Sequence, residues 1–195
     1  MYYTCGDSHS KLSFEGCPVT TTWNGEVANV VTMNRIGSEP NAFAGQYGLG
    51  DGCKVIACFG EIDVRCHVWR FADRHEMGAL GVMRDLVEGY RAALSSQRWL
   101  DTVVMSIVPP SPCNESTESG LYPFAGTDQQ RAWSTAVMNG MLAGMCFQHG
   151  WKYLDVHRLY ADRSGMLPRE LSDGNVHIGD TSRVRDELER MGLLD

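Results

Sequence analysis

The sequence lacks the features of several protein classes. Its 17 lysines and arginines are outnumbered by 24 aspartates and glutamates, giving a formal net charge of -7. Nucleic acid phosphates require a basic face, so we expect no nucleic acid partner. No apolar run approaches the ~18 residues of a membrane span, and no basic, apolar leader precedes the first predicted strand. We therefore expect no membrane partner and a cytoplasmic location.

The cysteines follow neither a disulfide nor a zinc pattern. There are seven of them, an odd number, at scattered positions and without a Cys-x-x-Cys pair. Such spacing does not predict a disulfide framework or a zinc knuckle. We interpret most of them as small buried hydrophobic residues in a reducing compartment. The sequence predicts no metal site and no cofactor.

What the sequence does contain is an alternation of short β-rich runs and helical patterns. Its 195 residues suffice for one domain, and we predict a single domain over 1–195. Strands are predicted over 2–5, 28–33, 54–59, 102–108 and 151–156. Helices are predicted over 76–97, from Asp128 as a cap to Gly150, and after Thr181. This order predicts an α/β fold: a three-layer α/β/α sandwich around a mostly parallel, about five-stranded sheet.

The first ten residues are the strongest candidate for a site. The strand run Tyr2–Cys5 ends abruptly in Gly6-Asp7-Ser8, which is typical of a strand that stops at a tight turn. Open α/β sheets bind ligands at the carboxyl ends of their strands, so Ser8 is placed where chemistry is expected. Alternatively, Asp7 or Ser8 only caps the next helix.

A base for Ser8 is available near the other end of the chain. A serine hydroxyl becomes a good nucleophile when a neighbouring histidine accepts its proton. His177 lies on a predicted loop after the fifth strand, and Asp173 precedes it by four residues. A carboxylate at that distance can hold the imidazole in the required tautomer, which predicts a Ser8–His177–Asp173 arrangement.

These motifs resemble the SGNH/GDSL hydrolases. Gly6-Asp7-Ser8, a third strand ending in Gly60-x-x-Asp63 and the late Asp-x-x-x-His occur in the order of that family. The resemblance implies a flavodoxin-like SGNH fold, with Ser8 as nucleophile and His177 as base. It also implies an oxyanion site built from the Ser8 amide, a glycine after the second strand and an asparagine after the third. Gly37 is the expected glycine, with Gly45 as the alternative.

The sequence departs from that family pattern at two places. Ile62 stands where the asparagine is expected, so a side-chain donor is missing, and Asn175 adds one residue between Asp173 and His177. The nearest replacement donors are Arg65 and His67. Of these, Arg65 is the expected donor, with an ion pair to Asp63 or Glu61 as its competing role.

The function predicted from these residues is that of a serine esterase acting through an acyl-serine intermediate. The resemblance to the SGNH/GDSL hydrolases implies that the substrate is an ester of a small acyl group such as acetyl, on a carbohydrate or another polar small molecule. An acyltransferase of the same fold is one alternative. The other is a non-catalytic relative that binds a glycan or a protein, because Ile62 removes a donor.

Overall fold

The structure is a computed structural model that describes residues 1–22, 32–39, 42–74, 77–113 and 122–194. Five parallel strands form one sheet in the order β2-β1-β3-β4-β5. The strands are β1 Tyr3–Gly6, β2 Thr20–Thr21, β3 Lys54–Cys58, β4 Asp101–Met105 and β5 Lys152–Leu154. The α-helices are α1 His9–Leu12, α2 Met33–Ser38, α3 Ala42–Tyr47, α4 Val68–Arg74, α5 Ala79–Ser95, α6 Asp128–His149, α7 Val156–Tyr160 and α8 Ser182–Arg190. A π-helical turn, η2, covers Asp63–His67, and a 3₁₀ turn, η3, covers Arg169–Leu171.

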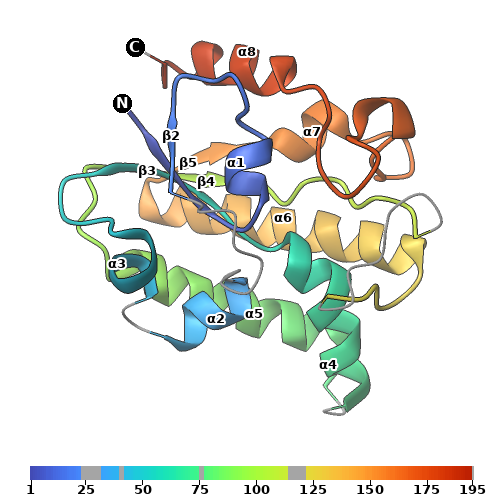
Figure 1. The fold of residues 1–195 in the computed structure, drawn as a ribbon. Helices are drawn as coiled ribbons and strands as arrows, with labels where there is room; N and C mark the ends of the chain where they lie inside the picture. Colours follow the sequence, from blue (N-terminus) through green and yellow to red (C-terminus); the bar gives the residue numbers. More distant parts are fainter. Residues whose placement is uncertain (23–31, 40–41, 75–76, 114–121, 195) are drawn as a thin grey trace.

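Helices cover both faces of the sheet. Figure 1 shows α1, α7 and α8 on one face, and α2, α5 and α6 on the other. The central strand β3 contributes side chains to the apolar clusters on both faces of the sheet, because alternate side chains of a strand point to opposite faces. Val55 and Ala57 join the apolar cluster under α5 and α6, whereas Ile56 and Cys58 join the cluster under α7 and α8. The predicted three-layer α/β/α fold is thus confirmed.

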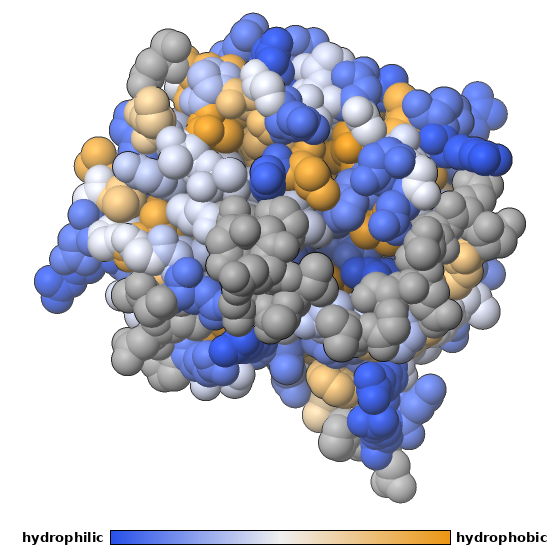
Figure 2. All heavy atoms as spheres, viewed as in Figure 1, coloured by the Kyte–Doolittle hydropathy of each residue, from blue (hydrophilic) through white to orange (hydrophobic). Residues whose placement is uncertain are grey.

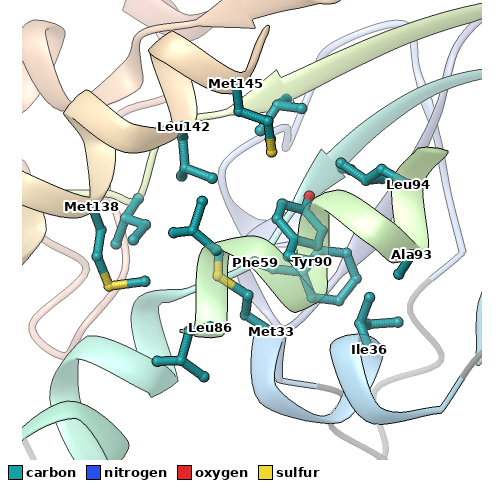
Figure 3. Packing of buried hydrophobic residues seen from close by; sticks show 14 of the residues in the cluster. Met33, Ile36, Phe59, Leu86, Tyr90, Ala93, Leu94, Met138, Leu142 and Met145 are labelled. Carbon is teal, nitrogen blue, oxygen red and sulfur yellow. The ribbon is translucent and has the colours of Figure 1, made fainter. Parts of the chain in front are cut away.

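The larger apolar cluster fixes α2, α5 and α6 against the sheet. In Figure 3, Met33 and Ile36 of α2 approach Tyr90 of α5, and Leu142 of α6 lies on the other side of that helix. Met33 and Leu142 are fully buried. Burying an aliphatic side chain of this size contributes roughly 1.5–3 kcal/mol. The residues at the start of α2 are therefore held firmly beside the end of β3.

The second strand is not where the sequence predicts it. It is β2 at Thr20–Thr21, outside all predicted strands, and the two residues are exposed at the edge of the sheet. Of the predicted strand 28–33, residues 28–31 lie outside the described part, and Met33 begins α2. Residues 34–38 continue that helix. Two caps explain the difference: the Thr32 hydroxyl accepts from the Arg35 amide, and the distant Asp63 carboxylate accepts from the amides of Met33 and Asn34.

The long helix α6 begins at Asp128, the residue that the sequence predicts as its cap. Thr127, not Asp128, is its N-cap and forms a reciprocal capping box with Gln130. Its end at Gly150 is as predicted, with φ of 68°. In the described part of the chain, no helix combines the length and apolar character needed to cross a bilayer. Figure 2 shows a mostly polar face with small, separated apolar areas.

Candidate active site

The turn after β1 is shaped by a glycine that no other residue could replace. Gly6 has φ of 152°, and a Cβ atom there would lie 1.9 Å from the Cys58 carbonyl oxygen of β3. The next amide, that of Asp7, donates to the same carbonyl. This close approach ends β1 at the carboxyl edge of the sheet and directs the chain into α1.

The sequence left open whether Asp7 and Ser8 cap the next helix or take part in chemistry, and the two residues differ in this respect. The buried Asp7 carboxylate accepts a hydrogen bond from the His9 amide at 2.9 Å and so caps the start of α1. Ser8 occupies the N-cap position, but its side chain makes no capping bond. Its Oγ lies instead 2.8 Å from His177 Nε2.

The loop of residues 172–178, here called the base loop, holds His177 in this position. His177 Nδ1 lies 3.0 Å from Asp173 Oδ2, and Asp173 Oδ1 accepts from the Asn175 amide at 2.8 Å. The ends of the loop are joined by the Ser172–Ile178 bridge and by the Asp173 amide, which donates to the His177 carbonyl. The extra residue at Asn175 is therefore accommodated within a closed loop. The Asn175 carbonyl accepts hydrogen bonds from the hydroxyls of Ser111 and Ser172.

The environment of His177 favours its neutral form. Burial, and then the charge of His9, lower the pKa of His177 to about 4, although the Asp173 carboxylate opposes them. At neutral pH the imidazole is then unprotonated. With Nδ1–H donating to Asp173, Nε2 carries the lone pair that faces the Ser8 hydroxyl. The arrangement can accept a proton from Ser8.

The segment of residues 60–67, here called the third-strand segment, follows β3 and carries the other predicted site residues. Gly60 has φ of 115°, and a Cβ there would meet Ile107 at 2.7 Å, so it permits close packing at the strand end. Asp63 is fully buried, caps α2 through two amides and lies 2.9 Å from His67 Nδ1. The carboxylate of Asp63 is therefore occupied in joining β3 to α2.

Arg65 forms a buried ion pair with Glu61. Its Nε and Nη2 donate to the two Glu61 carboxylate oxygens at 2.9 and 3.1 Å, and Nη1 donates to the Tyr122 carbonyl at 3.1 Å. Burial raises the pKa of Glu61, but Arg65 and then His9 outweigh it and lower that pKa to about 2. Of the two competing roles predicted for Arg65, these contacts favour the ion pair with Glu61.

Gly37 does not follow a strand. It lies inside α2, and a Cβ there would be 3.0 Å from the backbone of Gly89 in α5. Gly37 also lines a cavity of about 300 Å³ together with Met33 and Phe71, and none of Ser8, Asp173 and His177 lines it. Its role in the described structure is close helix packing. The alternative glycine, Gly45, lies in α3, and most residues that follow β2 in the chain, 23–31, lie outside the described residues.

Comparison with known proteins identifies this fold. No family model matches the sequence, and no curated protein matches it. A GDSL-like lipase from Bacteroides thetaiotaomicron matches with a TM-score of 0.54 at 10% identity, over 93% of this chain and 78% of that chain. A Bacteroides fragilis protein provisionally named an acylhydrolase gives 0.53 at 13% identity, over 97% and 82%. A protein from Streptococcus pneumonia provisionally described as a platelet activating factor gives 0.56 at 14% identity, over 98% and 81%. This chain has the SGNH/GDSL hydrolase fold.

These structural similarities establish the SGNH fold. At such low sequence identity they do not establish the reaction, which depends on the residues of the site. The departure at Ile62 is the main local difference from the family pattern. Its side chain is buried and packs with Cys66 and Tyr122. The place of the expected asparagine is thus occupied by an apolar contact.

His9 is a residue of the candidate site that the sequence motifs do not single out. It begins α1 directly after Ser8. Its ring is almost completely buried, and its centroid lies 4.8 Å from that of His177. The available signal was its position directly after the candidate nucleophile. Sequence alone could not indicate that a base 168 positions later would pack against it.

Proposed function

We propose that this protein is a serine esterase that hydrolyses esters of small acyl groups through an acyl-serine intermediate. The observation that carries the proposal is the hydrogen-bonded series of Ser8 Oγ, the His177 imidazole and the Asp173 carboxylate. Nucleophile, base and orienting acid are all within bonding distance, as this chemistry requires. The shared fold with a GDSL-like lipase is consistent with that reaction class.

The proposed reaction proceeds in two acyl transfers. Ser8 Oγ attacks the ester carbonyl while its proton passes to His177 Nε2, and Asp173 stabilises the resulting imidazolium. The tetrahedral intermediate collapses as the proton moves from His177 to the leaving alcohol. Water then attacks the acyl-serine, giving its proton to His177, and collapse returns that proton to Ser8 and releases the carboxylic acid.

The proposed oxyanion site is poorer than the family pattern. The Ser8 amide has no hydrogen-bond partner among the described residues, so it can donate to the developing oxyanion. Ile62 offers no side-chain donor, and Arg65 is bound to Glu61. Loss of one such donor costs roughly 3–4 kcal/mol of transition-state stabilisation. We therefore expect modest turnover numbers.

The proposed substrate is an acetyl-like ester of a carbohydrate or another polar small molecule. This choice follows the resemblance and the polar residues on the base loop, including Ser172, Asp173 and Asn175. A second candidate function is non-catalytic binding of a glycan or protein by the same fold, and Ile62 is the observation that favours it.

Covalent labelling separates the two candidates. A fluorophosphonate probe reacts with an activated serine, and mass spectrometry of the labelled peptide identifies its position. We expect labelling at Ser8 in the native protein and in Ser95→Ala, which removes an exposed hydroxyl at the end of α5. We expect none in Ser8→Ala. Intact native protein that stays unlabelled and does not hydrolyse p-nitrophenyl acetate, butyrate or octanoate would support the binding function instead.

A further inference from the structure

The imidazole of His9 is buried without a hydrogen-bond partner. Its relative exposure is 2%, and among the described residues neither Nδ1 nor Nε2 is hydrogen-bonded. The triad as proposed does not use it. Buried polar side chains are normally hydrogen-bonded, so one that makes no hydrogen bond beside Ser8 requires an explanation.

The ring of His9 packs on the ring of His177. Their centroids are 4.8 Å apart, and the planes are inclined by 50°. His9 is fixed from its own side by α1, since its amide is bonded to the Asp7 carboxylate. The face of His177 is thus supported by a rigid element, while its two nitrogens remain directed to Ser8 and Asp173.

The charged groups around the two rings differ. His9 faces the buried carboxylates of Asp7 and Glu61, with Glu61 Oε2 at 3.9 Å from His9 Nε2, an ion-pair distance. Arg65 lies behind Glu61 and partly offsets its charge. His177 is paired with the carboxylate of Asp173, whose side chain is 36% exposed, and the charge of Glu61 acts on it more weakly.

Two imidazolium rings this close in a buried site repel one another strongly. The two rings are therefore not protonated together, and the ring with the higher pKa binds the proton first. Burial lowers the pKa of His9, but Glu61 and then Asp7 outweigh it, and the pKa lies above its usual value. Burial, and then the charge of His9, lower the pKa of His177 to about 4. Both effects place the proton on His9.

We propose that His9 is the positioning residue of this site: its ring, fixed by α1 and by the ion pair with Glu61, holds His177 against Ser8, and a positive charge on His9 opposes a second one on His177. This inference rests on the esterase function proposed above. It has a consequence for the rate. Protonated His9 opposes the imidazolium that forms on His177 during attack, so loss of the His9 proton at higher pH strengthens the base and accelerates acylation.

The test is an NMR titration of the histidine ring protons in the native protein, His9→Gln and His9→Phe. In the native protein His9 should titrate above an ordinary histidine, and His177 below. Both variants remove the charge, so the His177 midpoint should rise by roughly one pH unit or more. In the native protein the rate of acylation should increase again at higher pH, when His9 loses its proton. The same two variants should lack this increase. His9→Phe keeps a ring against His177 and should retain more of kcat at the pH optimum than His9→Gln.

The control is His149→Gln, at the far end of α6, which should leave the His177 midpoint unchanged. An unchanged midpoint in folded His9 variants would overturn the proposal. If neither variant folds, the native titration decides, because a His177 midpoint above that of His9 contradicts the proposal. The NMR midpoints can be measured without turnover. Labelling of Ser8 with an unmoved midpoint would refute this inference alone, whereas absence of labelling would refute the esterase function.

Discussion

The base loop and the third-strand segment both bring ionisable side chains to the Ser8–His9 turn, yet they use them differently. In the base loop, the side chains of His177 and Asp173 are 13% and 36% exposed. In the third-strand segment, those of Arg65 and Glu61 are each 8% exposed and bonded to one another. The first pair is near solvent and accessible to a substrate, and the second is enclosed by the protein.

The difference lies in whether the hydrogen bonds of a side chain are already used by the fold. Arg65 donates three hydrogen bonds and Asp63 accepts three, all to groups that hold the fold together. His177 Nε2 has Ser8 Oγ as its partner, and that bond is the one the reaction would break. A side chain can take part in a reaction only if its hydrogen bond can be broken without destabilising the fold.

The largest effect should follow loss of the nucleophile or the base. Ser8→Ala and His177→Ala should each lower kcat on the order of 10⁵- to 10⁶-fold, and the double variant should be little worse, because the residues act as a unit. Asp173→Asn should be less severe. Steady-state kinetics on p-nitrophenyl acetate provide the measurement. Near-native activity in purified Ser8→Ala would remove the base loop from the mechanism.

Arg65→Met should affect stability more than catalysis. It leaves the buried Glu61 carboxylate without its main partner, which costs roughly 3–5 kcal/mol of unfolding free energy. Arg35→Met is the matched control, since the Arg35–Glu39 pair is 43% and 50% exposed and should be worth less than about 1 kcal/mol. Denaturant unfolding measures both. A sharp fall in kcat with unchanged stability would instead assign Arg65 to the transition state.

The acid sensitivity of the fold should depend on His177. Its folded pKa of about 4 lies below the usual value of 6.5, so between these pH values the unfolded chain binds a proton that the folded chain does not. The stability contributed by neutral His177 is complete above pH ~6.5 and is lost as the pH falls toward ~4, by about 3 kcal/mol. His177→Gln should lose correspondingly less stability between pH 7 and 4. Equal losses in the two proteins would show that His177 titrates normally.

Gly37→Ala should give the smallest effect and test the placement of α2. The added Cβ would lie 3.0 Å from the Gly89 backbone, so we expect a loss of roughly 1–3 kcal/mol with kcat unchanged. Gly140→Ala, on an open face of α6, should instead stabilise by up to about 1 kcal/mol. Thermal unfolding distinguishes the two. Native stability in Gly37→Ala would mean that α2 and α5 do not pack closely.

The sequence by itself determined the elements with strong local signals. The runs at β1, β3 and β4 are recognisable because a strand covered on both faces is almost continuously apolar. Helices α5 and α6 are recognisable from their apolar period. The motifs Gly6-Asp7-Ser8 and Asp173…His177 likewise predicted which side chains would meet, since the carboxyl ends of parallel strands lie at one edge.

Tertiary structure alone decided the features that depend on distant partners. Met33 starts a helix because Asp63, thirty residues later, caps it, and β2 at Thr20–Thr21 is defined by its pairing with β1 rather than by its side chains. Arg65 is occupied because Glu61 and the Tyr122 carbonyl enclose it, and His9 faces His177 because two chain ends fold together. Such capping, pairing and burial are set by the three-dimensional neighbours of a residue, which local propensity and spacing do not encode.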